Sequence, residues 1–584
     1  MTKNKIILSP VQTKTNQSKK YPIRVIFWLL AISLGAFQAW ANRYSISSED
    51  GISYLDIADA YLRGEWNVAI NPHWSPFYSW LLGLATLVLK PSTYWEFPVV
   101  KLVNFLIYLF TLGCFEFFLR EFIFYYNNNV SRFSRNSSFS ISKWTWLLLG
   151  YTLFIWSSLK WIGVSCDTPD MCTAAFVYLA SGIVLRVNTR SASWFNFIIL
   201  GLVLGFGYLA KSVMFPLAFV FLGVSAFSVG NLRRALPRVL AALLVFTVIS
   251  IPFIAAISTA KGRLTIGEAG KLSYAWYIGP IVADHHWQGE LPGTGTPKHP
   301  TRKIIAEPAA FEFGTPVGGT YPVWYDPSYW NEGLKPKFSL IKQIKKVAKN
   351  AVYYDKEFLG SLVFGYLILV GVSGSFWLSI QELTASWRLL IPAAAGLGIF
   401  LITTDVGLLV LELQASTRYI APFIVLLFAG VFSSMRLPNS SESRRLIAGI
   451  TIAVLVITGS QLSLQASKNV VTILRGPEHT HWQVAESLHE LGILPGEKVA
   501  DLKVKAYDYY WARLARVKIV AQIMDAEKFW TQDDVLRSKA LKTIERTGAR
   551  VIVQKDGSKI PDSAIATGWK KLGNTDSYAY LFRK

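Results

Sequence analysis

Long uncharged apolar runs recur along most of the 584-residue chain, and they constrain its fold more than any other feature. A run of roughly 20 apolar residues is long enough for a helix to cross a bilayer. The chain is 52% hydrophobic and only 16% charged, which is not the composition of a soluble protein. The sequence therefore predicts a polytopic α-helical membrane protein.

The distribution of Lys and Arg sets the predicted topology. Basic loops on the cytoplasmic side and anionic headgroups account for the net charge of +22, and we find no nucleic-acid-binding motif. With the N-terminus inside, nearly every short basic loop falls on the cytoplasmic side. This topology has about eleven spans, at residues 23–41, 98–118, 143–163, 171–187, two within 194–230, 239–257, 358–380, 389–404, 419–435 and 446–464.

The same topology divides the chain into three predicted regions. Residues 1–22 form a cytoplasmic N-terminal tail that is rich in lysine and has no acidic residue. Residues 23–465 form the transmembrane domain, which includes the outer loops 42–97 and 258–357. The composition then becomes that of a soluble protein, and alternating strands and helices predict an extracytoplasmic α/β domain over 466–584. The strands are expected at 498–502, 517–520 and 550–553.

The stretch after the first span carries the acidic pair Glu49 and Asp50. Asp50 and Tyr54 belong to a series at helical spacing, which predicts a short helix lying along the membrane surface. Residues 77–90 are apolar but too short for a comfortable span, so we expect a second surface helix. A solvated acidic loop is the simpler alternative for the acidic pair. His73, a lone histidine beside an aromatic ring, is most simply structural.

With this topology, further polar residues share the outer face with Asp50. They are Asp170, Lys211, Arg418 and Tyr419. Ionisable residues at or within spans are costly to bury and are therefore functional candidates. Carboxylates can bind a divalent cation or act as a base, whereas Lys and Arg can hold phosphate oxygens. A phosphate leaving group needs such positive charge. The outer face therefore carries both a carboxylate that could act on the acceptor and cations that could stabilise the leaving phosphate.

Asp170, Lys211 and Arg418 also have structural interpretations. Asp167 and Asp170 could cap the helix that begins near residue 171. Lys211 could extend its ammonium group toward a lipid headgroup. Arg418 could pair with Glu412, six residues away.

The motifs, taken in order, resemble those of GT-C superfamily glycosyltransferases, which include bacterial protein O-mannosyltransferase-like enzymes and the lipid A aminoarabinose transferases. The resemblance covers roughly residues 23–435. It rests on Glu49-Asp50 with Tyr54, the string 71–78, Thr168-Pro169-Asp170, the segment 205–211 and Arg418-Tyr419. Two departures leave the sugar and the acceptor open: Ser75 precedes Pro76 where some relatives carry Lys, and Glu-Asp stands where others have Asp-Glu.

The resemblance implies a polyprenyl-phosphate-linked sugar donor and inverting transfer outside the cytoplasm. It allows a divalent cation, Mg²⁺ or Mn²⁺, at Asp50 and Asp170. Asp50 takes the catalytic acidic position beside Glu49, and Asp170 takes the second acidic position. Lys211 and Arg418 take the phosphate-facing positions. The further substrate-binding candidates are Tyr54, His73 and Tyr419.

The predicted function is therefore that of a multi-pass glycosyltransferase of the inner or plasma membrane. It would transfer a sugar from a polyprenyl phosphate to a protein, lipid or glycan on the extracytoplasmic face. One alternative is transfer or ligation of a whole lipid-linked oligosaccharide. Another is a transporter or flippase of lipid-linked sugars, in which the same charges would line a pathway. A transporter should carry charges in the inner half of its spans, whereas the short inner loops here are merely basic.

Overall fold

The structure is a computed structural model, and it describes most of the chain. The described residues are 22–45, 49–133, 138–277, 301–314, 318–326, 338–356, 365–367, 370–371, 376–404, 417–435, 437–476, 479–504, 508–555 and 560–582. Residues 1–21 of the predicted tail lie outside these ranges, as do Glu412 and most of the predicted span 358–380.

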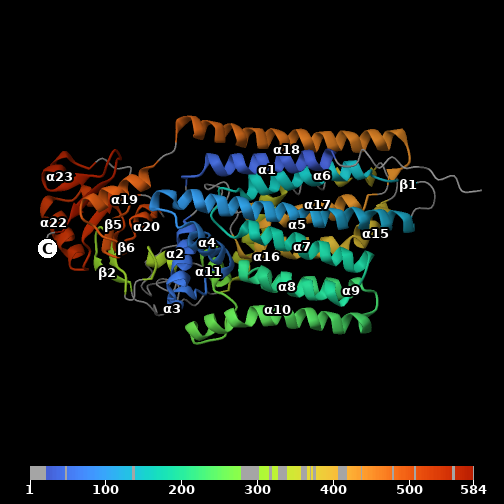
Figure 1. Ribbon diagram of the computed structural model, residues 1–584, viewed down its shortest axis with the longest axis horizontal. Helices are drawn as coiled ribbons and strands as arrows, with labels where there is room; N and C mark the ends of the chain where they lie inside the picture. The colour runs from blue at the N-terminus through green and yellow to red at the C-terminus, as the bar shows by residue number, and fades with distance from the viewer. Residues whose placement is uncertain are drawn as a thin grey trace, which may run out of the picture.

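Apolar helices running side by side form the larger part of the molecule (Figure 1). Five are long and apolar enough to cross a membrane: α1 Pro22–Ala41, α5 Glu96–Phe133, α7 Asp170–Thr189, α10 Leu232–Lys261 and α18 Ser441–Arg475. Shorter apolar helices are α4 Pro76–Leu89, α8 Trp194–Ala210, α9 Met214–Ser228, α16 Trp387–Thr403 and α17 Thr417–Ser433. The helix α6 Lys143–Trp156 continues into a π-helix, Ser157–Ile162.

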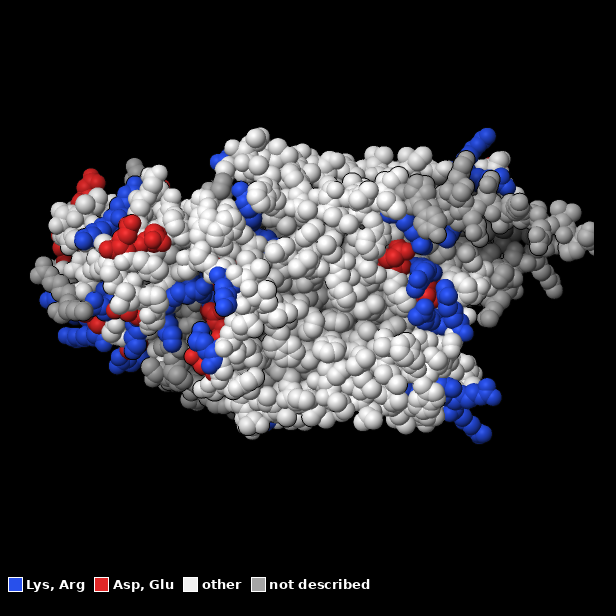
Figure 2. Space-filling model, viewed as in Figure 1, with Lys and Arg blue, Asp and Glu red and all other residues white. Residues whose placement is uncertain are grey.

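The surface of the bundle matches this composition. Figure 2 shows Lys, Arg, Asp and Glu gathered toward its two ends, with an uncharged band between them. Leu240, Leu244 and Val248 of α10 are more than half exposed, as expected for side chains that face lipid. The protein is thus a polytopic α-helical membrane protein, as predicted, while the number of spans stays a prediction.

An α/β domain covers one end of the bundle (Figure 1). Its seven-stranded sheet has the order β2-β3-β6-β5-β7-β9-β8, with β6, β5 and β7 parallel and the outer pairs antiparallel. The strands are β2 Arg302–Ile305, β3 Ala310–Glu312, β5 Lys498–Leu502, β6 Lys518–Ile523, β7 Val551–Gln554, β8 Trp569–Lys571 and β9 Tyr578–Leu581. The helices are α19 Thr480–Glu490, α20 Tyr510–Leu514, α21 Ala526–Trp530, α22 Asp534–Glu545 and α23 Asp562–Ala566.

Two features differ from the predicted division of the chain. The loop 258–357 was assigned to the transmembrane domain, yet its strands β2 and β3 extend the C-terminal sheet by pairing with β6. This pairing covers the backbone groups that an edge strand would otherwise expose. The boundary at 465/466 falls inside α18, because neither Pro nor Gly occurs between Gly459 and the C-cap, Gly476.

Small elements lie between the bundle and the sheet, and α2 Asp50–Arg63 is the most important of them (Figure 1). It begins at Asp50, as the helical spacing predicted, and packs on α4. The other elements of the chain are α3 Trp66–Ala69, η1 Thr93–Trp95, α11 Ala269–Tyr277, α12 Pro322–Tyr325, α13 Leu340–Tyr354, α15 Phe376–Ala385 and the strand pair β1 Ser138–Phe139 with β4 Leu437–Pro438. Of these, α15 and β1 lie at the end of the bundle opposite the sheet (Figure 1).

Candidate active site

The first turn of α2 places Asp50 at the end of the bundle that faces the α/β domain. Glu49 occupies the N-cap position, and Gly64 ends the helix with a left-handed φ of 72°. One turn after Asp50, the buried ring of Tyr54 packs edge-on against Trp74 and Tyr78, with centroids 5.1 and 5.2 Å away. Because these rings hold Tyr54 in the core, they fix the side of α2 that carries Asp50.

Arg418, near the start of α17, joins the two predicted carboxylates. Its Nη2 donates to Asp50 Oδ2 at 3.0 Å, and its Nε lies 3.3 Å from Asp170 Oδ2. Its side chain is only 8% exposed. The planar guanidinium suits this bridging role, since it presents several donors in one fixed plane. Residues that are 120 and 248 positions apart in the sequence therefore meet at one point.

Lys211 completes the cluster from the break between α8 and α9. Its Nζ forms an ion pair with Asp170 Oδ1 and lies 3.9 Å from the centroid of the Tyr419 ring. The Tyr419 hydroxyl is 3.0 Å from Arg418 Nη2. Thr168 also donates to Asp170, at 2.7 Å. The buried Asp170 is thus matched by two cations, and it fixes where both of them lie.

Two predicted residues lie at the margin of this cluster. Burial lowers the pKa of His73 to about 4, against an ordinary value of 6.5, so its ring is neutral near pH 7. No described residue forms a hydrogen bond with its buried Nδ1. Glu49 faces the α/β domain, because its carboxylate acts on Tyr510 of α20 in that domain. Burial raises the pKa of Tyr510, and the nearby carboxylates of Asp167 and Glu49 raise it further. The structure therefore brings together Asp50, Tyr54, Asp170, Lys211, Arg418 and Tyr419.

The interpretation of Asp167 as a helix cap is wrong. The N-cap of α7 is Pro169, without a side-chain cap, and Asp167 instead pairs with Lys101 at 2.6 Å. Both side chains are almost completely buried, and Asn104 also donates to Asp167. Lys101 is not among the predicted site residues, although a lysine inside a predicted span is itself a signal of pairing or function. Cys166, whose Sγ is 3.2 Å from Arg418 Nη1, is not among them either.

The residues present do not fit a divalent cation at Asp50 and Asp170. The oxygens of Asp170 already face Lys211, Arg418 and a threonine hydroxyl, and Asp50 faces Arg418. Mg²⁺ and similar ions need about six oxygen ligands, and here cationic side chains occupy the space beside the carboxylates. Within the described ranges, no three His, Cys, Asp or Glu residues are grouped so that they could hold a metal ion.

Comparison with known proteins gives structural similarities only, since no protein-family model and no curated protein matches the sequence. The chain is similar to ArnT from Cupriavidus metallidurans bound to undecaprenyl phosphate, with 13% identity, 95% of this chain and 97% of that chain covered, and a TM-score of 0.43. It is also similar to the oligosaccharyltransferase AglB from Archaeoglobus fulgidus in complex with an inhibitory peptide and a dolichol-phosphate (12% identity, 91% and 69% covered, TM-score 0.45). A third similar structure is the Archaeoglobus fulgidus oligosaccharyltransferase in complex with Zn and sulfate, with 13% identity, 91% of this chain and 68% of that chain covered, and a TM-score of 0.39.

Proposed function

We propose that the protein is a membrane glycosyltransferase that transfers a sugar from a polyprenyl phosphate to a protein, lipid or glycan acceptor. One observation carries this proposal: Arg418 joins Asp50 to Asp170, and Lys211 pairs with Asp170 beside it, at one end of a lipid-facing bundle. A carboxylate for the acceptor and two cations for a phosphate are what such a transfer requires.

In the proposed reaction, an acceptor hydroxyl or amine attacks C1 of the sugar. The bond between C1 and the phosphate oxygen breaks, and its electron pair leaves with the polyprenyl phosphate. The acceptor proton passes to the Asp50 carboxylate, which acts as general base or orients the acceptor. A single displacement of this kind inverts the configuration at C1. The sugar is a hexose or a pentose.

Lys211 and Arg418 stabilise the negative charge that develops on the leaving phosphate. Charge-assisted hydrogen bonds to phosphate are among the strongest that side chains make, especially from a guanidinium. Asp170 holds both cations in place before the donor binds, so little reorganisation is needed during the reaction. Asp170 is therefore a positioning residue in this proposal.

The remaining candidate residues surround the groups that would react. The Tyr419 ring carries Lys211 on its face, and Tyr54 lies beside Asp50 on α2. The neutral His73 ring offers a buried nitrogen for a hydroxyl or a phosphate oxygen. Glu49 lies toward the α/β domain, on the acceptor side in this proposal.

We propose that the reaction takes place outside the cytoplasm. At the opposite end of the bundle, Arg186 and Arg190 surround the fully buried Glu121, with Nε of Arg190 only 2.9 Å from its carboxylate. Arg233 and Arg234 begin α10 at this end. Basic residues gather on the cytoplasmic side of membrane proteins, which supports an extracytoplasmic site and α/β domain.

Mass spectrometry of a deletion strain tests the proposed function. Polyprenyl-phosphate sugars and envelope glycans are compared in the strain with and without the protein. We expect one lipid-linked sugar to accumulate while one acceptor lacks that sugar. Unchanged glycans and an unchanged donor pool would contradict the proposal, as would movement of the lipid-linked sugar across vesicles without any glycosyl product.

A further inference from the structure

A short helix of the α/β domain, α20, packs against α2, the helix that carries Asp50. All five residues of α20 are buried. Its two ends contact α2 in different ways, one through an ion-pair cluster and the other through a close steric fit. The contact joins the α/β domain directly to the candidate active site.

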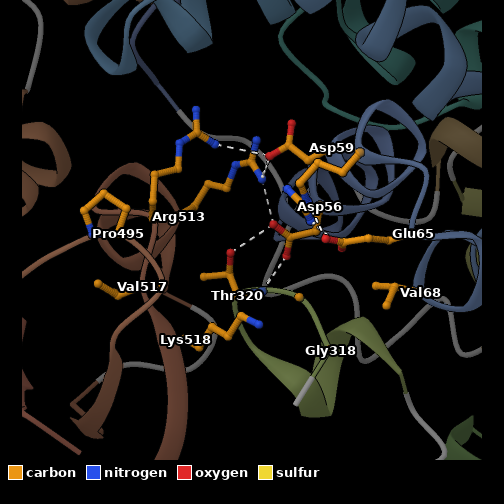
Figure 3. Close-up of a pocket in the computed structure, with 14 residues that line it drawn as sticks. Asp56, Asp59, Glu65, Val68, Gly318, Thr320, Pro495, Arg513, Val517 and Lys518 are labelled. Carbon is orange, nitrogen blue, oxygen red and sulfur yellow. Dashed lines mark hydrogen bonds and ion pairs between the residues drawn. The ribbon is translucent and has the colours of Figure 1, made fainter. Parts of the chain in front are cut away.

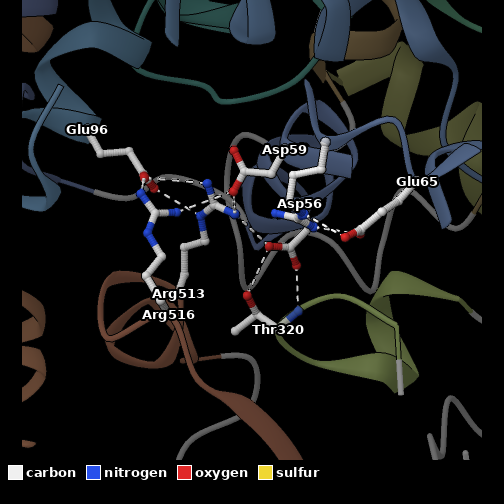
Figure 4. Close-up of polar contacts among 8 residues, drawn as sticks. Asp56, Asp59, Glu65, Glu96, Thr320, Arg513 and Arg516 are labelled. Carbon is white, nitrogen blue, oxygen red and sulfur yellow. Dashed lines mark hydrogen bonds and ion pairs between the residues drawn. The ribbon is translucent and has the colours of Figure 1, made fainter. Parts of the chain in front are cut away.

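Arg513 of α20 forms the ion-pair cluster. Its Nη1 lies 2.8 Å from Asp56 and 2.6 Å from Asp59, both on α2, and its Nε lies 3.0 Å from Glu96 at the start of α5 (Figure 4). The Arg513 side chain is only 5% exposed. Arg516 also pairs with Glu96. Removing one partner of such a buried cluster leaves uncompensated charge, so these contacts fix the relative position of the helices.

A loop from the extended sheet strengthens the same cluster. Thr320 donates to Asp56 twice, from its backbone N–H at 2.7 Å and from its hydroxyl at 2.9 Å. These residues line a cavity of about 390 Å³ between α2 and the sheet (Figure 3). Every carboxylate of the cluster already faces an arginine or Thr320, so the cluster joins helices and is not an open ligand site. We call it the clamp; its members are Asp56, Asp59, Glu96, Thr320, Arg513 and Arg516.

At its other end, α20 fits against the turn that begins α2. A Cβ at Gly51 would lie 2.5 Å from the Tyr510 hydroxyl and 2.8 Å from Asp167 Cβ. Only glycine leaves room here for the Tyr510 side chain. The Tyr510 ring packs edge-on against Phe97, with centroids 4.9 Å apart. Tyr510 is therefore fitted directly beside the residue that follows Asp50.

The clamp contacts the face of α2 that is turned away from the reacting groups. At roughly 100° per residue, Asp56 and Asp59 lie about 240° and 180° around the helix axis from Asp50. Tyr54, in contrast, is only about 40° from Asp50. The α/β domain thus holds α2 from behind, while Asp50 meets Arg418 on the other side.

We propose that Arg513 and Tyr510 are positioning residues that hold α2 so that Asp50 reaches Arg418. The catalytic part of this inference rests on the proposed function. Loss of the clamp frees α2 without disturbing the pair of Lys211 and Asp170, which belongs to other helices. Turnover should then fall while donor binding persists.

Hydrogen–deuterium exchange and transfer kinetics on the full-length protein in nanodiscs test the inference. The variants are Arg513→Gln, Arg513→Lys and Tyr510→Phe. The matched control is Lys518→Gln, which removes a positive charge from the same cavity. Among the described residues, Lys518 forms no ion pair with α2. For Arg513→Gln we expect at least tenfold faster exchange in residues 50–63 and at least a tenfold lower kcat, with the donor KM within twofold of the parent value. The Lys and Phe variants should give smaller changes in the same direction.

The outcomes separate this inference from the proposed function. Unchanged exchange in α2 and unchanged kcat for the Arg513 and Tyr510 variants would overturn the inference and leave the function standing. Equally faster exchange in α7 and α17 would also overturn it, because that result means general destabilisation. If the parent protein transfers no sugar, the function fails, and the exchange of α2 still decides whether Arg513 and Tyr510 position it.

Discussion

At the scale of single residues, the site depends on how four charges are matched. Asp50 and Asp170 share Arg418, and Asp170 also holds Lys211. A buried charge that loses its partner is strongly destabilising, so each member constrains the others. In the proposed function, the same arrangement keeps two cations ready for a phosphate.

Substitution of Lys211 tests the role of these cations. Lys211→Met should lower the transfer rate by about 10²- to 10³-fold, since one donor to the developing phosphate charge is lost. It should also weaken binding of polyprenyl phosphate, measured by direct titration. The control is Lys528→Gln, a lysine on the exposed surface of the α/β domain. Normal transfer by the Lys211 variant would remove this residue from the phosphate site.

His73 gives a pH-dependent prediction. Its pKa falls from 6.5 to about 4 on folding because burial disfavours the charged ring, so below about pH 6.5 the unfolded chain binds a proton that the folded protein does not. From about pH 7 to about pH 5, the parent protein should lose about 2 kcal/mol of stability that His73→Gln retains. Thermal melting at several pH values measures this difference, and parallel loss in both proteins would contradict it.

At the scale of elements, glycines decide how closely helices of the bundle approach. A Cβ at Gly396 of α16 would run into the ring of Phe423 on α17, the helix that carries Arg418. Gly398 lies on the same helix, and a Cβ there would meet nothing within 4 Å. Small residues at helix contacts are what permit such packing in membranes.

This pair of glycines offers a matched test. Gly396→Ala should destabilise the protein by about 1–3 kcal/mol, because the new methyl group overpacks the α16–α17 contact. Gly398→Ala should be neutral or slightly stabilising, since alanine favours the helix. Melting temperatures in detergent compare the two variants. Equal melting temperatures would mean that α16 does not pack on α17 in this way.

The sequence predicted some elements well and others not at all. Asp50 and Tyr54 share one face of α2, which follows from helical spacing, and β5 covers the residues that the apolar pattern assigned to it. Pairing of β3 with β6 joins segments about 200 residues apart, and no local pattern predicts it. The same is true of Arg513, whose partners lie on α2 and α5. Local periodicity defines elements, whereas buried ion pairs depend on tertiary contacts.

At the scale of the whole molecule, the two ends of the bundle differ. One end carries the α/β domain (Figure 1) and the candidate site, and the other carries the cluster around Glu121. The uncharged band in Figure 2 separates them, as a membrane would require. We therefore assign the two ends to opposite sides of the membrane.

Cysteine labelling tests this orientation. The native cysteines Cys114, Cys166 and Cys172 are buried, so they give little background. Thr531→Cys, on the exposed surface of the α/β domain, should react with an impermeant maleimide in sealed right-side-out vesicles. Asn231→Cys, exposed at the far end, should react only after permeabilisation. The reverse pattern would place the site in the cytoplasm.

In the proposed function, transfer depends on the carboxylate of Asp50, and substitution of this residue tests that dependence. The lipid-linked sugar that accumulates in the deletion strain is supplied to purified Asp50→Asn protein, and acceptor glycosylation is followed by mass spectrometry. The control is Glu65→Gln, an exposed carboxylate beyond the end of the same helix. We predict a fall in rate of about 10²- to 10⁴-fold for Asp50→Asn, with the protein still folded and donor binding retained, and no loss for the control. Full activity of the Asp50→Asn protein would contradict the account.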